Sequence, residues 1–168
     1  YNVCPTDAIS MKDDREGFLV PSIDETKCIK CGMCAKICPA LHYKLKNDPE
    51  PDCYAVWADE EIRMVSSSGG MFTLLAEYVL EKGGAVCGAA YTEDYRNVKH
   101  IVVEDKKGLE KLRGSKYVQS DIGLVYREIR DILKQDRYVL FCGCPCQVAG
   151  LYSFLQKEYP KLYTCDLI

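Results

Sequence analysis

The chain of 168 residues has room for one ordinary domain, or for a small module joined to a medium one. Hydrophobic residues make up 48% of the chain, which is enough for a packed core, and the formal net charge of −3 argues against a nucleic-acid or anionic-membrane partner. No apolar stretch approaches the length of about 18 residues expected of a transmembrane helix, and the first residues do not form a signal peptide, so we expect a soluble, cytoplasmic protein.

Cysteine is unusually frequent, with eleven residues in the chain. A secreted protein would use so many for disulfides, but here the count is odd, no export signal is present and most cysteines crowd into two short clusters. This distribution favours metal ligation in a reducing compartment.

The strongest motif is CIKCGMCAKICP, which places Cys28, Cys31, Cys34 and Cys38 at spacings x2, x2 and x3, with a proline after the last. This is the bacterial ferredoxin run, in which three closely spaced thiolates hold one cubane and the fourth reaches the other cluster of a pair. A structural zinc site would need two well-separated CxxC pairs. The motif therefore predicts 4Fe-4S ligation.

The first five residues, YNVCP, have the form of the end of a second such run. The first three residues would be its x3 spacer and Cys4 its fourth ligand, so we expect three cysteines upstream and a chain that is a fragment at this end. By the crossover rule, Cys4 joins Cys28, Cys31 and Cys34 on one cluster, whereas Cys38 serves a second cluster.

Between the two runs, DAISM and GFLVPSI flank the polar turn KDDREG and predict a hairpin of two short strands. We assign residues 1–46 to a ferredoxin-like module. Its second half lacks a clear matching strand in PALHYKLKN. The stretch NDPEPD, residues 47–52, interrupts regular structure and predicts the domain boundary.

The second domain, residues 53–168, alternates segments of strand and helix character. Strands are expected over 53–58, 61–65, 84–91, 98–105, 137–143 and 161–168, and helices over 71–82, 105–113, 122–135 and 145–159. Such alternation predicts an α/β layer with a mostly parallel sheet, incomplete because the sequence stops within a strand. The predicted fold class is α+β, a two-cluster ferredoxin-like module followed by this truncated α/β domain.

The first chemical candidate in this domain is SSSGG, residues 66–70, at the start of a predicted helix. Free backbone N–H groups, small side chains and the positive helix end can cradle the phosphate of a nucleotide cofactor. Simple N-capping by serine, with glycines in the turn, is the alternative interpretation.

The second candidate is LRGSKYVQS, residues 112–120. Its glycine spacing and the order of Lys and Ser differ from a P-loop, which excludes a nucleoside triphosphatase on this motif. Lys116, with Ser115 and Tyr117, could hold a phosphate and flank an aromatic ring. A loop with a solvated lysine is about as good an interpretation.

The third candidate is FCGCPCQVAG, in which Cys142, Cys144 and Cys146 follow a hydrophobic strand and precede a helix. Ligands bind at the carboxyl ends of parallel strands, and helix N-termini favour thiolates, so Cys146 is a candidate cluster ligand or redox thiol. A role in disulfide exchange is the rival interpretation, although the spacing is not CxxC.

The remaining cysteines and the histidines stand alone. Cys53, Cys87 and Cys165 belong to no local motif, and Cys87 is predicted to be a buried small hydrophobe. His42 and His100 are isolated, and we expect neither to be a ligand.

The combination of the ferredoxin runs with SSSGGMFTLLAEYVLEKGG, LRGSKYVQS and PCQVAGL resembles the coenzyme F420 hydrogenase/dehydrogenase beta-subunit family over essentially the whole chain. This family consists of iron-sulfur flavoproteins that use FAD. The resemblance implies a C-terminal domain beyond the present sequence. It also implies that Cys146 ligates a further cluster, and that FAD contacts lie at Ser67, Ser68, Gly69, Gly70, Gly114, Ser115, Lys116 and Tyr117.

The resemblance implies an oxidoreductase that relays electrons between paired 4Fe-4S clusters and FAD, which exchanges hydride with a deazaflavin-like or other soluble acceptor. The implied partners are a redox partner protein or subunit and a small hydride carrier or substrate. Position 144 is a cysteine where relatives carry a small residue such as threonine. The alternatives are a non-enzymatic ferredoxin-type carrier whose α/β domain docks a partner, and a thiol-disulfide protein built on Cys142, Cys144 and Cys146.

Overall fold

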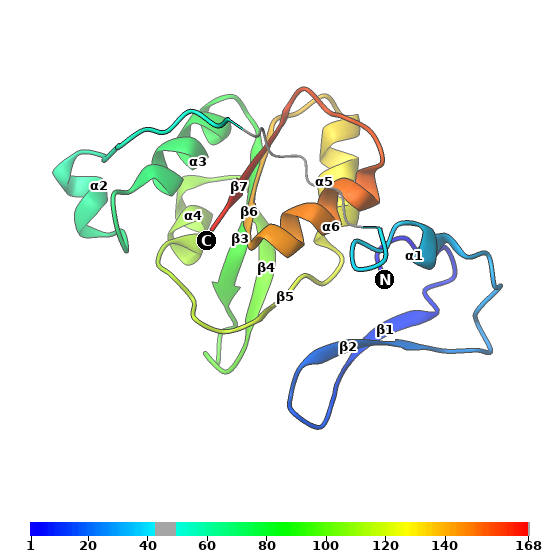
Figure 1. Cartoon of the computed structure of the whole chain (residues 1–168). Helices are drawn as coiled ribbons and strands as arrows, with labels where there is room; N and C mark the ends of the chain where they lie inside the picture. Colours follow the sequence, from blue (N-terminus) through cyan, green and yellow to red (C-terminus); the bar gives the residue numbers. More distant parts are fainter. Residues whose placement is uncertain (43–49, 168) are drawn as a thin grey trace.

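The computed structural model describes residues 1–42 and 50–167 of the chain (Figure 1). The predicted end of the ferredoxin-like module at 43–46, and residues 47–49 of the predicted boundary, lie outside the described residues.

The N-terminal module contains the predicted hairpin. Strand β1 (Ile9–Asp13) pairs antiparallel with β2 (Leu19–Ile23), with Ile9 opposite Ile23. The turn is held by the Asp14 carboxylate, which accepts hydrogen bonds from the backbone N–H groups of Glu16 and Phe18, each at 2.9 Å. A short helix within the cysteine run, α1 (Met33–Lys36), was not predicted.

The α/β domain contains ten elements in chain order. They are α2 (Glu60–Met64), α3 (Met71–Glu81), β3 (Ala85–Tyr91), β4 (Val98–Val103), α4 (Lys106–Leu112), β5 (Ser120–Asp121), α5 (Val125–Lys134), β6 (Val139–Gly143), α6 (Pro145–Leu155) and β7 (Leu162–Asp166).

The five strands of this domain form one sheet in the order β5-β4-β3-β6-β7. β4 and β5, β3 and β6, and β6 and β7 pair in parallel, and only β3 and β4 are antiparallel. The mostly parallel sheet predicted from the alternation of strands and helices is therefore confirmed.

Helices cover both faces of the sheet, with α3 and α4 on one face and α5 and α6 on the other (Figure 1). The side chains of β6 alternate between the faces: Val139 and Phe141 pack under α5 and α6, and Leu140 packs under α3 and α4. A strand buried on both faces reads as a continuous hydrophobic run, which is the pattern of VLFC.

Two predicted strands are wrong. Residues 53–58 form no strand, and the segment predicted as a strand over 61–65 contains α2 instead. Two acidic residues, Glu60 and Glu61, occupy the first turn of this helix and Arg63 its last, an arrangement that the helix dipole favours. The alternation of apolar and polar residues was too short to distinguish the two structures.

The face of α3 that is buried also differs from the hydrophobic pattern. Thr73, Ala76 and Val79 are buried, whereas Leu74 and Tyr78 remain 37% and 48% exposed.

Within residues 1–42 and 50–167, no helix has both the length and the apolar character needed to cross a bilayer.

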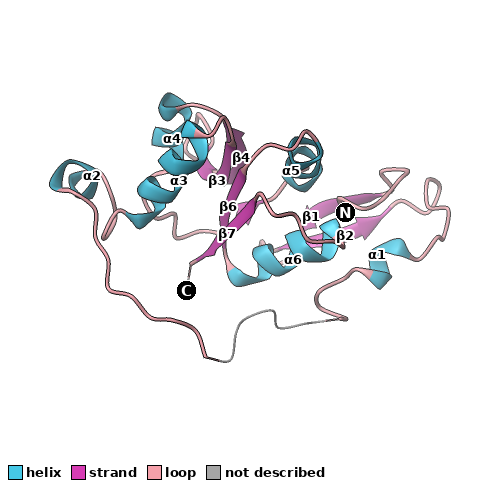
Figure 2. Ribbon diagram, turned by 90° about the horizontal axis from the view of Figure 1, so that it is seen from above, coloured by secondary structure: helices cyan, strands magenta, loops and turns pink. Residues whose placement is uncertain are grey.

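The hairpin module lies beside the α5 and α6 side of the sheet in both ribbon views (Figure 2). Val3 packs against the hydrophobic cluster formed by α5, α6 and the sheet, so the N-terminal segment shares the core of the α/β domain.

Candidate functional site

A cavity of about 550 Å³ brings the three candidate stretches of the α/β domain together. This volume is in the range of small-molecule and cofactor sites. Its wall is formed by residues 66–73, 112–116, 118–122, 142–144 and 146–147, by Gly88 and Ala89 of β3, His100 of β4 and Cys165 of β7 among others, and by Tyr1, Met11 and Leu19 of the N-terminal module. The cavity thus lies where the two modules meet.

The SSSGG segment is shaped by its glycines. Gly70 has φ +83° and is the N-cap residue of α3, and a Cβ at this position would lie 2.9 Å from Cγ2 of Ile62. Gly69 approaches the extended 53–58 segment so closely that its Cβ would lie 2.9 Å from the Val56 carbonyl oxygen. Both glycines therefore have a packing role that does not depend on a ligand.

The start of α3 carries no side-chain cap. The interpretation that a serine caps this helix is therefore wrong: Ser66 instead donates to the Ile62 carbonyl at 2.7 Å, and the Ser67 hydroxyl accepts from the Ser115 N–H at 2.8 Å. Because α3 has eleven residues and no side-chain cap, its start carries free N–H groups and a partial positive charge. The first residues of α3 line the cavity, so this end of the helix is suited to bind an anion there.

The Lys116 side chain is bound by backbone carbonyl groups at the end of α4. Its ammonium group donates to the carbonyl oxygens of Lys111, Leu112 and Arg113 at 3.3, 2.8 and 2.7 Å, which are exposed at the end of α4. An ammonium group has three donors, so its hydrogen bonds are used in capping this helix. Burial lowers the pKa of Lys116.

Arg113, next to this lysine, was not singled out from the sequence. Its Nε atom is buried and has no hydrogen-bond partner, and the residue lines the cavity. A buried guanidinium donor left unpaired is costly, and an anionic ligand would satisfy it. The signal in the sequence was an arginine directly before the GSK turn.

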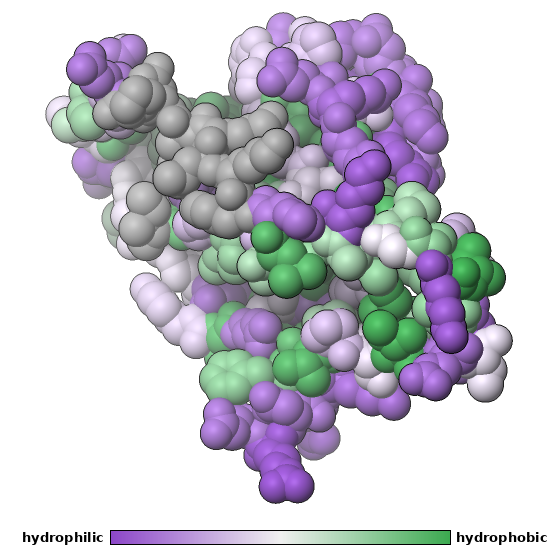
Figure 3. Space-filling model, turned by 45° about the vertical axis from the view of Figure 1, so that its right-hand side comes forward, coloured by the Kyte–Doolittle hydropathy of each residue, from purple (hydrophilic) through white to green (hydrophobic). Residues whose placement is uncertain are grey.

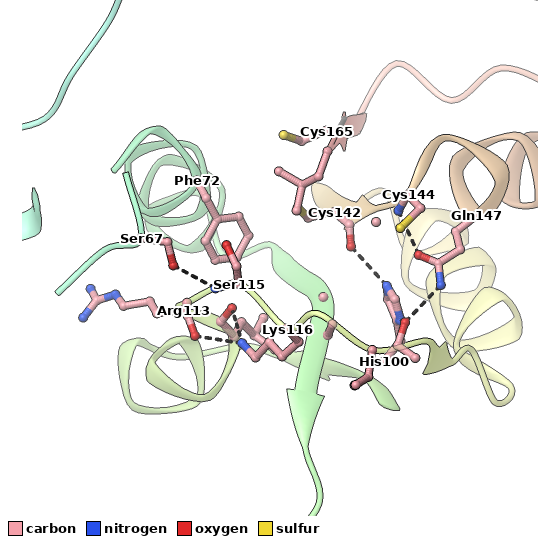
Figure 4. A pocket seen from close by; sticks show the side chains of 18 of the residues that line it. Ser67, Phe72, His100, Arg113, Ser115, Lys116, Cys142, Cys144, Gln147 and Cys165 are labelled. Carbon is pink, nitrogen blue, oxygen red and sulfur yellow. Dashed lines mark hydrogen bonds between the residues drawn. The ribbon is translucent and has the colours of Figure 1, made fainter. Parts of the chain in front are cut away.

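The segment after β6 is held by a hydrogen-bond circuit of five residues (Figure 4). The Cys144 N–H donates to Oε1 of Gln147 at 2.8 Å, and Nε2 of Gln147 donates to the Ser120 hydroxyl at 3.0 Å. Ser120 pairs with Nδ1 of His100 at 3.0 Å, and Nε2 of His100 pairs with the Cys142 carbonyl at 3.1 Å.

This circuit fixes the protonation of His100. A carbonyl oxygen only accepts, so Nε2 of His100 carries the proton, and Nδ1 accepts from the Ser120 hydroxyl. Burial lowers the pKa of His100, with smaller opposing effects from the Cys142 carbonyl and the Asp121 carboxylate. The imidazole is therefore neutral, and it is a structural member of the wall rather than a ligand.

Cys146 lies in the first turn of α6, is exposed and lines the cavity. Cys144 is the N-cap residue of this helix, and its carbonyl oxygen accepts from the Gln147 N–H at 2.9 Å. Tyr117 is 92% exposed and is not part of the cavity wall. The other residues of the predicted FAD set all line it.

In the N-terminal module, the sulfur of Cys4 sits in a polar environment. It accepts a hydrogen bond from the Ala8 N–H at 3.3 Å and lies 3.6 Å from the Thr6 hydroxyl. The Thr6 hydroxyl, and then backbone N–H groups, hold the pKa of Cys4 below its usual value. Donors directed at a sulfur are the arrangement that supports a thiolate ligand.

The other module cysteines differ in exposure. Cys28 and Cys38 are half-buried, and Cys31 and Cys34 are exposed. Among the described residues, no group of three or more Cys, His, Asp or Glu is arranged to hold a single metal ion.

Arg127 of α5 fixes the Cys4 segment to the α/β domain. Its Nε donates to the Asn2 carbonyl at 2.7 Å, and its Nη2 donates to the Cys4 carbonyl at 2.9 Å and to Oδ1 of Asp7 at 2.7 Å. The buried Asn2 side chain donates to the Gly123 carbonyl at 3.0 Å. One guanidinium therefore holds the backbone of a predicted cluster ligand against α5.

Known proteins share both parts of this arrangement. Residues 53–125 match the family model described as coenzyme F420 hydrogenase/dehydrogenase, beta subunit N-term. Residues 1–41 match the model of the 4Fe-4S dicluster domain.

An uncharacterized ferredoxin of Methanocaldococcus jannaschii is 41% identical over 51 residues, which are 30% of this chain and 30% of that ferredoxin. A chain in a solved structure of the F420-reducing NiFe hydrogenase complex from Methanosarcina barkeri, derivatised with xenon, superposes with a TM-score of 0.52 at 22% identity. That match covers 73% of this chain and 46% of the hydrogenase chain, and it concerns the fold alone. The chain thus spans less than half the length of either protein.

Proposed function

We propose that this chain is an oxidoreductase that passes electrons between 4Fe-4S clusters in residues 1–46 and FAD bound in the cavity of residues 53–168. Hydride exchange would then occur with a soluble acceptor, either a deazaflavin-like coenzyme or another small carrier. The family match of each segment supports this combination. A redox partner protein or subunit would be the other electron donor or acceptor.

The observation that carries the proposal is the shared cavity. Tyr1, Met11 and Leu19 of the iron-sulfur module line it together with the SSSGG segment. Arg127 fixes Cys4 at the same junction. Electron transfer requires the two cofactors to be close, and a cavity built from both modules supplies that proximity.

The residues of the wall suit the anionic part of FAD. We propose that the uncapped start of α3 and the Arg113 guanidinium face its phosphates. Ser67, Ser68, Gly69, Gly70, Gly114 and Ser115 would form the remaining contacts, and Lys116 would shape their loop by capping α4. Tyr117 would contact FAD only after turning inward from its exposed position.

Bound FAD would supply exchange between one-electron and two-electron steps. The chain itself would bind and orient the cofactor, exclude water and hold the two modules in a fixed relative position. On the cluster side, Cys4, Cys28, Cys31 and Cys34 would hold one cluster and Cys38 would belong to the second. Cys146 would contribute to a further cluster.

Anaerobic reconstitution with iron, sulfide and FAD tests the proposal through the absorbance spectrum. We expect flavin bands on top of a broad iron-sulfur shoulder. A shoulder without flavin bands would contradict the FAD site and leave the electron carrier. The carrier alternative draws support from hydrophobic side chains that could dock a partner, since Trp57 and Met64 are 70% and 78% exposed.

A second measurement addresses the site itself. Replacing Arg113 with alanine removes a charged donor whose hydrogen bond is worth about 1.5–3 kcal/mol, so FAD affinity should fall roughly ten- to hundredfold. Titration followed by flavin fluorescence measures this change. Arg63→Ala is the matched control, because Arg63 is exposed on α2 and outside the cavity wall. Equal affinities of the two variants would contradict the phosphate assignment.

A further inference from the structure

Two cysteines that belong to no common sequence motif lie side by side at the end of the sheet. Cys142 of β6 is the direct partner of Cys165 in the parallel register with β7 (Figure 4). Adjacent strands are about 4.8 Å apart, and disulfides join Cα atoms separated by roughly 4.4–6.8 Å. The backbone positions of this pair therefore already satisfy the main distance requirement of a disulfide.

The two cysteines differ in exposure. Cys142 is only 7% exposed, whereas Cys165 is half-buried, and both line the cavity. A small reactant entering the cavity would therefore reach Cys165 first.

The surroundings also give the two thiols different properties. The thiol of Cys142 lowers the pKa of Cys165, although burial and the Asp166 carboxylate act in the opposite direction. The thiol of Cys165, and then burial, raise the pKa of Cys142. An accessible thiolate beside a protonated, buried thiol is the arrangement of a redox-sensing pair.

The neighbouring cysteines lie in other positions. Cys144 is the exposed N-cap residue of α6, and Cys87 lies in the hydrophobic cluster on the opposite face of the sheet, where burial raises its pKa. Among the described residues, no third ligand joins the pair in a metal-binding group.

We propose that Cys142 and Cys165 form a redox-active dithiol, which low-molecular-weight disulfides oxidise to a cross-strand disulfide in the cavity wall. This inference does not depend on FAD. It assigns a reaction to Cys165, which belongs to no local motif. It differs from the thiol-disulfide alternative built on Cys142, Cys144 and Cys146, because the second cysteine of the pair is Cys165.

The reaction is a two-step exchange. The Cys165 thiolate attacks one sulfur of the small disulfide, whose S–S bond breaks and releases one thiolate. Cys142 then loses its proton to that thiolate and attacks the Cys165 sulfur, which releases the second small thiolate. The two cysteines lose two electrons, and the small disulfide gains them.

The test uses the full chain with its clusters reconstituted under anaerobic conditions. The protein is equilibrated with mixtures of oxidised and reduced glutathione, then free thiols are alkylated and tryptic peptides are mapped by mass spectrometry. We expect a cross-linked species of peptide 138–157 and the peptide that begins at Leu162, two hydrogens lighter than their sum. Fragmentation should locate the bond at Cys142.

Substitutions separate this pair from other cysteines. Cys142→Ser keeps a hydroxyl donor but removes the second sulfur, so it should trap glutathione on Cys165 as a stable mixed disulfide. Cys144→Ser should still form the cross-link. Absence of the cross-link in the unmodified chain across all mixtures would overturn the proposal, as would a cross-link that is lost in Cys144→Ser.

Discussion

Replacing Arg127 with alanine should release the Cys4 segment from α5, and the contacts give the size of the effect. Two of its three hydrogen bonds go to main-chain carbonyls, at 2.7 and 2.9 Å, and the side chain is only 26% exposed. Hydrogen bonds to charged groups contribute about 1.5–3 kcal/mol each. Allowing water to replace part of them, Arg127→Ala should lower the free energy of unfolding by about 2–4 kcal/mol.

The ion pair with Asp7 should contribute little of this. The Asp7 side chain is 72% exposed, and pairs of this kind are worth about 0–1 kcal/mol. Asp7→Ala is therefore the matched control, with an expected loss below about 1 kcal/mol. Arg127→Lys keeps the charge but not the planar fork, so it should behave more like the alanine variant than like the unmodified chain.

Urea unfolding of the reconstituted protein, followed by far-UV circular dichroism, measures these changes. With a slope of about 2 kcal/mol per molar urea, Arg127→Ala should shift the midpoint by roughly 1–2 M. Combining Arg127→Ala with Asp7→Ala completes a double-mutant cycle. If Asp7→Ala costs as much as Arg127→Ala, or if Arg127→Lys is fully stable, the carbonyl contacts do not hold the segment and the reasoning is refuted.

Four further outcomes can be measured. Gly84→Ala should lower the free energy of unfolding by about 1–3 kcal/mol in urea titrations, because its Cβ would lie 2.6 Å from the Tyr138 carbonyl oxygen. His100 has a lowered pKa in the fold, so its unfolded form binds more protons; stability should decline as pH falls below about 6.5. This decline should persist when the exposed His42 is replaced. If the decline disappears in that variant, it comes from His42 and not from His100. Lys116→Met should cost about 1 kcal/mol through loss of the cap on α4, and unchanged urea midpoints would contradict that role. Cys31→Ser should remove the iron of one cluster, as colorimetric iron analysis would show, whereas unchanged iron content would exclude Cys31 as a ligand.

Much of the α/β fold could be predicted because its elements carry strong local patterns. VLFC reads as a strand buried on both faces, and the helix after SSSGG ends before Gly83, whose φ is +69°. The segments predicted wrongly were short and exposed. At 61–65, five residues fit a strand as well as a turn of helix, and the first-turn acids were the better signal.

The candidate site could be predicted only in part. The spacing of cysteines is local information, so the ligand run was recognised from the sequence alone. The partners of His100 lie 20 and 42 positions away, and the Cys142–Cys165 pair depends on strand register. Contacts of this kind form only when the sheet assembles, so no local pattern in the sequence predicts them.

Lys116 illustrates the same limit at a single residue. A lysine after Gly-Ser suggests an anion site, and its position beside the cavity agrees with that hypothesis. Its three carbonyl partners are set by where α4 ends, which gives the ammonium group a helix-capping role and leaves the neighbouring Arg113 with the unpaired donor.

The hydrogen-bond circuit around His100 has a consequence for proton supply. Each member donates to the next, from the Cys144 N–H to the Cys142 carbonyl, so the protons can be ordered in only one direction. Protonating the imidazole at Nδ1 would turn that nitrogen into a donor, so the Ser120 hydroxyl would accept from both Gln147 and His100 and would have to turn its own proton away. Proton uptake by His100 therefore requires the Ser120 hydroxyl to reorient and leaves its proton without this acceptor.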